Sequence, residues 1–342
     1  MALTNFPNGI TSFGIPVLGG ANVPFTGKYF FVDPANGNDG NKGRSPSDAF
    51  ATLYKAHDAC TSGDNDVVYL IGDGSTAATA RLSLALAQTI DSSVTAGTLV
   101  WSKNATHLIG ITAPTSVSAR ARLAPPTGTY TMATFGSGNF VTVSGAGCVF
   151  ANISLFHGFS TGGASQICWT DSGGRNYYEN VHFGGAGDAA SAQATTSRSL
   201  LVTGTGECTF VRCTVGLDTV TKTVANASLE LAGATPRNRF TECVFPLMTS
   251  AATPYFILGT GAGAIDRWTL FERCMFYNAV DSTSTTVSVV ASLNAAAGGS
   301  LVMQGCTAVG ATKWGDAGAL ANTYVDNAPP TAATSGLAVN PS

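Results

Sequence analysis

A short word, Phe-x-x-Cys-x-apolar, recurs along this chain at nearly constant spacing. It occurs in the stretches "TFVRCTV" (209–215), "RFTECVF" (239–245) and "LFERCMF" (270–276). With its cysteine as a marker, Cys213, Cys243, Cys274 and Cys306 are separated by 30, 31 and 32 residues. Spacing of this kind indicates that each unit is one turn of a repetitive structure in which equivalent residues stack.

The same register extends towards the N-terminus, where Val181 and Ile153 take the marker position. Apolar side chains accompany each marker, three residues before it and two residues after it. Those before are Phe150, Tyr178, Phe210, Phe240, Phe271 and Met303, and those after are Leu155, Phe183, Val215, Phe245, Phe276 and Ala308. An apolar or alternating run closed by small residues precedes each word, as in "LLVTGTG" (200–206). Each unit therefore holds short extended segments separated by turns.

Short strands at regular spacing are typical of three architectures: a β-sandwich, a β-propeller and a β-solenoid. Propeller repeats are longer, at about 40–50 residues, and carry their own signatures. A solenoid requires the same apolar position in every coil, because successive coils stack about 4.8 Å apart. Phe over Phe and Cys over Cys meet that requirement. We therefore predict an all-β solenoid with coils of about 30 residues.

The residue just before each marker predicts how the coil bends. On a straight strand, the Phe at −3 and the marker would lie on opposite faces, so a bend between them is needed to turn both inward. Asn or Gly suits a left-handed bend residue, whereas Arg and Glu depart from that pattern. The residues at this position are Asn152, Asn180, Arg212, Glu242, Arg273 and Gly305. Glu242 has Arg212 and Arg273 as its register neighbours, which predicts a surface ladder of alternating charge.

The repeated word resembles the coils of right-handed parallel β-helices of the pectin-lyase-like superfamily. The stretch "KYFFVDPANGNDGNKGRSPSDAFATLYKAHDAC" (28–60) also resembles the N-terminal segment of that superfamily, in which an extended run leads to a capping helix. The resemblance implies a right-handed parallel β-helix with a short N-terminal capping helix. Phe50, Leu53, Ala56 and Ala59 have helical spacing, with Ser45 or Ser47 as the expected N-cap. The fold alone does not define a function, because lyases, hydrolases, adhesins and viral spikes share it.

We expect four parts along the chain. They are an N-terminal docking arm at 1–27, a capping segment with a short helix at 28–77, the parallel β-helix at 78–311 and an irregular C-terminal segment at 312–342. The C-terminal segment is expected to cover the unpaired edge of the last coil. The arm lacks the repeat and carries isolated apolar residues that need a partner surface. The predicted partner-docking residues are Phe6, Ile10, Phe13, Ile15, Val17 and Leu18.

Composition argues against several function classes. Charged residues are 11% of the chain, against about 25% in average proteins. The net charge of −3 gives no footprint for nucleic acid or for an anionic membrane. No apolar stretch approaches the roughly 18 residues of a membrane span, and the N-terminus lacks a secretion-signal pattern. We therefore predict neither a nucleic-acid nor a membrane partner, and synthesis in a cytoplasm with release by lysis.

The eight cysteines and four histidines lack the spacing of zinc ligands. We expect the stacked cysteines to be packed thiols, because the Cβ vectors of stacked residues run parallel. No phosphate loop and no nucleophile elbow occurs in the sequence. The sequence thus predicts no catalytic residue, no cofactor-binding residue and no metal ligand.

A polysaccharide-cleaving enzyme is the alternative, and it requires two or three carboxylates close together. Glu179 and Glu272 share a register position but should lie about 14 Å apart. Four aspartates are expected in turns, where they cap backbone N–H groups, and a catalytic pair among them is the minor hypothesis. They are Asp171, Asp188, Asp218 and Asp266.

Two further patterns have a functional and a structural interpretation. The stretch "DPANGNDGN" (33–41) offers oxygen ligands for calcium, but it also has the form of Asn-Gly and Asp-Gly turns, which we favour. The four tryptophans are suited to stacking on sugars, but single aromatic residues on apolar strands more often belong to the core. They are Trp101, Trp169, Trp268 and Trp314.

The opening "ALTNFPNGITSFGIPVLGG" resembles the N-termini of tailed-phage virion proteins. The resemblance implies a non-enzymatic bacteriophage structural protein of the virion, above all a capsid decoration protein. Its arm would anchor to the major capsid protein, and its solenoids would associate side by side as a homotrimer after synthesis in the host cytoplasm. The alternatives are a tailspike-type polysaccharide depolymerase and a receptor-binding spike.

Overall fold

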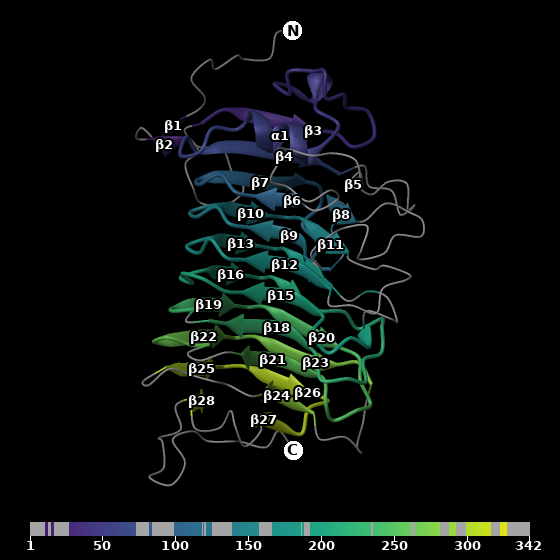
Figure 1. Cartoon of the computed structure of the whole chain (residues 1–342), viewed down its shortest axis with the longest axis vertical. Helices are drawn as coiled ribbons and strands as arrows, with labels where there is room; N and C mark the ends of the chain where they lie inside the picture. The colour runs from purple at the N-terminus through teal and green to yellow at the C-terminus, as the bar shows by residue number, and fades with distance from the viewer. Residues whose placement is uncertain are drawn as a thin grey trace.

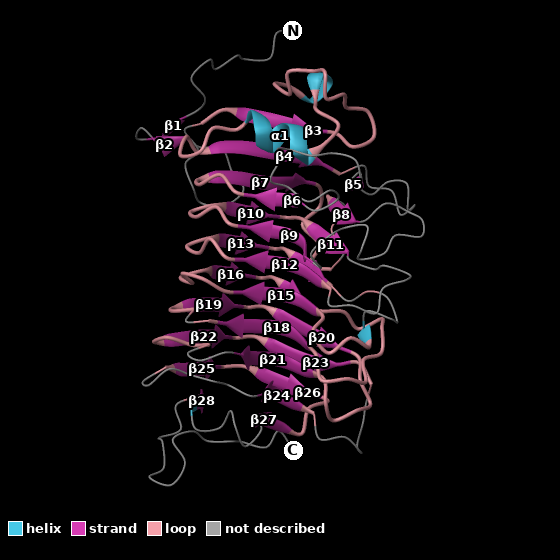
Figure 2. Cartoon of the chain, in the orientation of Figure 1, coloured by secondary structure: helices cyan, strands magenta, loops and turns pink. Residues whose placement is uncertain are grey.

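The computed structural model describes residues 11–12, 15–16, 27–72, 82–83, 99–117, 119, 121–124, 139–156, 166–185, 187, 192–233, 235–260, 264–280, 287–291, 299–315 and 322–326. Three parallel sheets wind around a common axis, and successive coils add one strand to each sheet (Figure 1). Figure 2 shows that strands dominate the molecule, with a short helix at its N-terminal end. The predicted β-solenoid is confirmed.

The largest of the three sheets, called sheet I here, has ten strands. They are β3 (Tyr29–Val32), β4 (Asp66–Ile71), β7 (Thr106–Ile111), β10 (Val149–Ala151), β13 (Tyr177–Glu179), β16 (Thr209–Val211), β19 (Asn238–Thr241), β22 (Trp268–Glu272), β25 (Ser300–Gln304) and β28 (Thr323–Val325). Each pairs in parallel with the strand before and after it in this order, so residues about one coil apart are register partners.

The other two sheets have eight strands each. Sheet II consists of β5 (Leu82–Ser83), β8 (Arg122–Ala124), β11 (Ser154–Phe156), β14 (His182–Gly184), β17 (Thr214–Val215), β20 (Val244–Leu247), β23 (Met275–Asn278) and β26 (Thr307–Val309). Sheet III consists of β6 (Leu99–Trp101), β9 (Asn139–Val143), β12 (Ile167–Asp171), β15 (Arg198–Val202), β18 (Ala227–Ala232), β21 (Tyr255–Thr260), β24 (Ser288–Ala291) and β27 (Lys313–Gly315).

Stacked aromatic rings form the centre of the core on the inner face of sheet I. The ring centroids of Tyr178 and Phe210 are 4.6 Å apart, those of Phe210 and Phe240 4.4 Å, and those of Phe240 and Phe271 4.7 Å. The rings are parallel to within 5°. All four side chains are fully buried. The ladder predicted from the repeated word is therefore confirmed.

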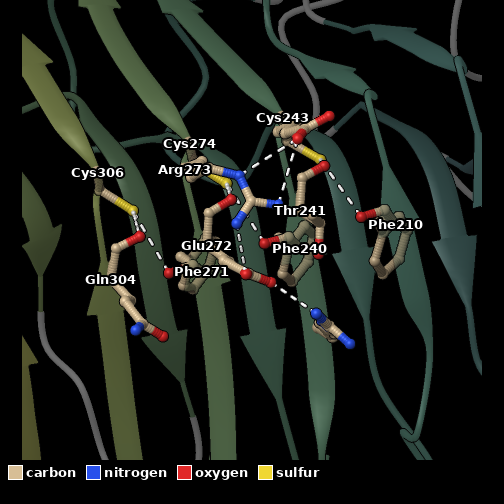
Figure 3. A network of polar contacts seen from close by, with 12 residues as sticks. Phe210, Phe240, Thr241, Cys243, Phe271, Glu272, Arg273, Cys274, Gln304 and Cys306 are labelled. Carbon is tan, nitrogen blue, oxygen red and sulfur yellow. Dashed lines mark hydrogen bonds and ion pairs between the residues drawn. The ribbon is translucent and has the colours of Figure 1, made fainter.

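The cysteines form a second internal ladder beside the rings (Figure 3). Each thiol donates to the carbonyl oxygen of the ring residue one coil earlier: Cys243 to Phe210 at 3.5 Å, Cys274 to Phe240 at 3.4 Å and Cys306 to Phe271 at 3.4 Å. Burial raises the pKa of Cys243, which keeps its thiol protonated as a donor. All eight cysteines are free thiols.

Each coil bends between sheets I and II at one residue with a positive φ angle. The six residues just before the markers have φ between 50° and 60°: Asn152, Asn180, Arg212, Glu242, Arg273 and Gly305. The left-handed bend is thus present even where the residue is Arg or Glu, which costs roughly 1–2 kcal/mol. Hydrogen bonds between coils continue through the bend and offset this cost, as from Glu242 N to Glu272 O at 2.8 Å.

A short helix, α1 (Leu53–Ala59), covers the N-terminal end of the solenoid. Its N-cap is Thr52, whose side chain accepts a hydrogen bond from Lys55 N at 3.2 Å. The expectation of Ser45 or Ser47 as the N-cap was wrong. Ser45 instead precedes the separate 3-10 helix η1 (Pro46–Asp48).

The N-terminal edge of sheet I is also paired. Phe50, expected in the helix, instead forms a bridge with Val32 of β3. Phe31 N donates to Gly43 O at 2.8 Å, and Phe50 N donates to Phe31 O at 2.9 Å. These bonds satisfy backbone groups that an edge strand would otherwise expose.

The solenoid extends on both sides of the range 78–311 expected from the sequence. Strands β3 and β4 already belong to sheet I, and β27 and β28 lie in the segment expected to be irregular. The reason is that these strands pair in the same parallel register although they lack the repeated word. Within the described ranges, no helix combines the length and apolar character that crossing a bilayer requires.

Replacing a core ring should destabilise the protein far more than replacing an outward residue of the same sheet. For Phe240→Ala we expect a loss of about 3–5 kcal/mol, because the cavity lies between two stacked rings. The control is Leu270→Ala, which removes a half-buried side chain from the outer face of β22. Urea unfolding followed by circular dichroism measures both, and equal losses would contradict the stacked core.

Candidate functional site

The bend between sheets I and II carries a row of ion pairs on the outside of the solenoid. Arg273 Nη1 is 2.6 Å from Glu272 Oε1, and Arg273 Nη2 is 3.2 Å from Glu242 Oε1. Arg239 Nη2 is 2.6 Å from Glu272 Oε2. Figure 3 shows the Arg273 guanidinium outside the row of cysteines and next to Glu272. Two of these ion pairs, Arg273–Glu242 and Arg239–Glu272, thus join successive coils, whereas Arg273–Glu272 lies within one coil.

The ladder predicted at this bend is only half present. Glu242 pairs with Arg273 as expected, but Arg212 pairs with Glu179 instead of Glu242. Only 21% of the Glu179 side chain is exposed, against 45% for Glu242. An ion pair with the less exposed carboxylate is less screened by water and salt, which accounts for the choice of partner.

A complete ladder of the predicted kind stands at the other end of the strands of sheet I. Glu207 Oε2 is 2.7 Å from Arg175 Nε, and Glu207 Oε1 is 2.5 Å from Arg237 Nη1. Burial alone would raise the pKa of Glu207, but the hydrogen bonds and charges of the two arginines outweigh it and lower the pKa. This row was not predicted from the sequence, although its members follow the same spacing of one coil.

A groove of about 580 Å³ opens beside the first row of ion pairs. One wall is the bend between sheets I and II, and the other is the segment 112–117 that follows β7. Thr214 Oγ1 donates to Ser116 O at 2.7 Å and so holds the segment against β17. The lining residues are Pro114, Ser116, Glu179, Asn180, Arg212, Thr214, Glu242 and Val244.

The guanidinium groups reach further into solvent than most of their carboxylate partners. The side chains of Arg212 and Arg273 are each 55% exposed, against 21% for Glu179 and 18% for Glu272. Hydrogen bonds from Arg239 and Arg273 lower the pKa of Glu272, so it is ionised at neutral pH. The groove and its rim therefore present cations outermost, with anions beneath them.

Glu179 is held by a second group besides Arg212. Tyr177 Oη donates to Glu179 Oε2 at 3.0 Å. Burial and this hydrogen bond raise the pKa of Tyr177 to about 12, so the phenol remains a donor at neutral pH. The two groove carboxylates, Glu179 and Glu242, lie two coils apart, roughly 9.6 Å along the axis. Each contacts a guanidinium, an arrangement that favours ligand binding over proton donation.

Of the four aspartates considered as a catalytic pair, the three that the structure describes do not form one. Asp171 ends β12 instead of lying in a turn and is fully buried facing the core, but its carboxylate caps the backbone N–H of Gly174 as expected. Asp218 is exposed in the loop after β17, and Asp266 lies before β22 next to Arg267. Asp188 lies outside the described residues.

Asp171 belongs to a buried network of polar groups. Its carboxylate accepts from Tyr178 Oη at 2.6 Å, Asn176 Nδ2 at 2.9 Å and Gly174 N at 2.9 Å. Tyr178 Oη in turn accepts from Trp169 Nε1 at 3.2 Å. A buried carboxylate that is this well satisfied fixes the contact between sheets III and I.

The stretch 33–41 uses its oxygen atoms internally. Asp33 Oδ1 accepts from Ala35 N at 3.0 Å and Asn36 N at 3.1 Å. Asp39 Oδ1 accepts from Ala51 N at 2.9 Å and Thr52 N at 3.0 Å, and so fixes the start of α1. These contacts support turns over a calcium loop. Among the described residues, no group of three or more His, Cys, Asp or Glu side chains has the arrangement of a metal site.

Three of the four tryptophans lie in the core, as expected. Trp101, Trp169 and Trp314 are at most 5% exposed. Trp268 is different, because 40% of it is exposed at the start of β22, at the opposite end of the strand from the groove. The predicted docking side chains lie outside the described residues: Phe6, Ile10, Phe13, Ile15, Val17 and Leu18. Of this part of the chain, the backbone pair β1 (Thr11–Ser12) and β2 (Ile15–Pro16) is described.

The groove itself was not predicted as a site. Its carboxylates and Arg212 were noted as register positions, but the segment 112–117 was not assigned any role. The register of the repeat could not predict this wall of the groove, because the segment 112–117 carries no repeated word. The usable signal was the run "TAPTSVS" (112–118), a proline-containing polar loop long enough to reach across strands of other coils.

Comparisons with known proteins identify the fold. No protein-family model and no curated protein matches the chain. Among solved structures, pectate lyase Pel9A superimposes with a TM-score of 0.57 at 11% identity, covering 88% of this chain and 68% of that chain. A pectin methylesterase in complex with a hexasaccharide gives 0.51 at 13%, covering 89% and 81%. Pectin methylesterase PemA from Erwinia chrysanthemi gives 0.50 at 14%, covering 85% and 82%.

These similarities define the class of the protein by its fold. The chain has the right-handed parallel β-helix fold of these pectate lyase and pectin methylesterase structures, which confirms the fold that the repeated word and residues 28–60 suggested.

The two adjacent tyrosines of β13 provide a test of the buried network. Tyr178→Phe leaves Trp169 Nε1 without its acceptor and removes a donor from Asp171, so we expect a loss of about 1–3 kcal/mol. Tyr177→Phe is the matched control, because it removes only the bond to the partly exposed Glu179. Urea unfolding should show a clearly smaller loss for the control, and the reverse order would contradict the buried network.

Proposed function

We propose that the protein binds a polysaccharide in the groove between the segment 112–117 and the bend of sheets I and II. The observation that carries the proposal is the groove's lining, which combines carboxylates, a guanidinium, an amide and hydroxyls in about 580 Å³. Together such polar groups can accept from sugar hydroxyls and donate to sugar hydroxyls and carboxylates. The shared fold supports the proposal, since the similar structures include a pectate lyase and a pectin methylesterase with bound hexasaccharide.

The charge arrangement favours an acidic polysaccharide. Arg212 lines the groove and Arg273 stands next to Glu242 on its rim, and both guanidiniums are more exposed than their carboxylate partners. Arginine is suited to planar, bidentate contacts with carboxylates. A uronate-containing chain would therefore gain charge-assisted hydrogen bonds without displacing the ion pairs beneath. This function corresponds to the receptor-binding alternative of the sequence analysis.

Binding to an acidic polymer should depend on the groove arginines. Isothermal titration with polygalacturonate should show binding that weakens as salt rises, and none with neutral dextran. Arg212→Gln should weaken the affinity about tenfold or more, because it removes a charge-assisted contact and leaves Glu179 without its guanidinium partner. The matched control is Arg175→Gln in the distant row, which should bind like the unmodified protein.

The outcomes of this titration separate the alternatives. Absence of binding to acidic polymers, or equal losses for the two variants, would contradict the proposal. The same mixtures are assayed for new reducing ends. Their appearance, together with their loss in Glu242→Gln, would extend binding to the depolymerase that the sequence analysis kept as an alternative.

We propose a second role, a decoration protein on a phage capsid, for the N-terminal arm. The observation that favours it is that β1 and β2 form an antiparallel pair separate from the three parallel sheets. An arm that is not part of the solenoid is free to bind the major capsid protein. The solenoid would then project from the virion and carry the polysaccharide groove outward.

Deletion of residues 1–27 tests the anchoring role. We expect the truncated chain to keep its circular dichroism spectrum and its affinity for polygalacturonate, because the three sheets and the groove lie beyond residue 27. We expect it to lose co-sedimentation with capsids depleted of the protein. Undiminished capsid binding would contradict the role of the arm.

A further inference from the structure

Trp268 differs from the other three tryptophans in lying on the outer face of sheet I. It begins β22, whose residues alternate between the core and the surface. Thr269 and Phe271 are buried, so Trp268, Leu270 and Glu272 face outward. Trp268 is 40% exposed, although an indole ring is among the largest apolar groups that a core can bury. Part of its apolar surface is therefore open to a ligand.

The backbone in front of Trp268 places the ring on this outer face. Arg175, Glu207 and Arg237 are left-handed bend residues of the preceding coils, with φ between 53° and 59°. The parallel register places Trp268 one coil after Arg237, so the bend would be expected at the tryptophan. It occurs instead at Arg267, one residue earlier and with a φ of 87°. Strained backbone of this kind clusters at functional sites, and here it makes Trp268 the first residue of its strand.

Guanidinium groups flank the indole ring. Arg237 lies one coil before Trp268, and Arg239 follows two residues later on the outer face of β19. Both arginine side chains are more exposed than the two carboxylates with which they pair. Arg267 adds a third guanidinium, whose side chain is 65% exposed. Cations therefore lie outermost beside the ring, as they do at the groove.

The outer face of β22 leads from Trp268 to the rim of the groove. Glu272 ends the strand and pairs with Arg273, whose guanidinium also contacts the groove residue Glu242. Four residue steps of about 3.3 Å each put the two ends of β22 roughly 13 Å apart. A polysaccharide that occupies the groove can therefore continue along the strand, across sheet I, and reach the indole.

We propose that Trp268 is a second sugar-binding subsite, on which one ring of an acidic polysaccharide stacks as the polymer crosses sheet I from the groove. The inference rests on the function proposed for the groove and adds the direction in which the polymer runs. The apolar C–H face of a sugar ring packs on the indole, while its carboxylate contacts a guanidinium beside it. Three arginines near the ring suit a uronate better than a neutral sugar.

Substitution of Trp268 tests the subsite in the polygalacturonate titration of the full chain. Trp268→Ala should weaken the affinity about three- to tenfold, because the stacking of one sugar ring is lost. Trp268→Tyr, which keeps an aromatic face, should retain most of the affinity. The matched control is Met275→Ala, which truncates a similarly exposed apolar residue on sheet II and should bind like the unmodified protein.

Tryptophan fluorescence gives a second measurement, which a loss of folding alone would not reproduce. Acrylamide should quench Trp268 before the three buried tryptophans, and saturating polygalacturonate should protect it from quenching. Trp268→Phe should abolish this polymer-dependent protection, because the other three indoles stay buried with and without the polymer.

The outcomes distinguish a failure of this subsite from a failure of the groove. Weaker binding by both Arg212→Gln and Trp268→Ala supports one polymer that contacts both places. Weaker binding by Arg212→Gln alone, with no protection of Trp268, would overturn the subsite and leave the groove intact. Weaker binding by Trp268→Ala alone would contradict the groove and the path from it. An equal loss in Met275→Ala, or no binding of acidic polymers at all, would also overturn the proposal.

Discussion

The stacking of like residues in successive coils is the constraint on which the rest of the structure depends. Parallel register puts Phe240 directly between Phe210 and Phe271, at ring spacings of 4.4 and 4.7 Å. Because every coil repeats the same inward positions, the core is built from rows of equivalent side chains that run along the axis. The same register also aligns the outward residues, so the residues at one outward position of successive coils form a row along the axis. The ion-pair rows arise in this way.

The bend between sheets I and II connects this core to the surface chemistry. Its left-handed residue turns the ring ladder and the thiol ladder inward together, and points its own side chain outward. Glycine would serve the backbone best, yet Arg212, Glu242 and Arg273 occupy the bend at φ between 51° and 56°. Their strain is balanced by backbone bonds between coils. The bend therefore carries charged side chains, and those of Arg212 and Glu242 line the groove.

The faces of the solenoid differ in charge, and this difference suits them to different functions. The bend beside sheet I carries paired charges with guanidiniums outermost, which suits an acidic polymer chain. Sheet II carries no charged residue in its strands from β14 to β26. The segment 112–117 lies where the two meet, since it walls the groove and its Ser116 contacts β17 of sheet II. The two N-terminal strands outside the three sheets leave the arm as the element proposed for anchoring.

The sequence by itself determined the repeating part of this protein. The spacing of Phe240, Cys243 and Phe245 defined the coil, the inward ladders and the left-handed bend, because stacked coils demand the same residue type at the same position. What does not repeat was decided only by the tertiary structure. Asp171 turned inward because Tyr178, one strand further on, supplies its hydrogen bond. Arg212 pairs with Glu179 because its long side chain reaches this carboxylate, which is less exposed than that of Glu242. The groove exists because the segment 112–117, which lies outside the repeat, folds back over β17. Periodicity determines what every coil shares, whereas side-chain direction and loop placement depend on neighbours that only the folded chain brings together.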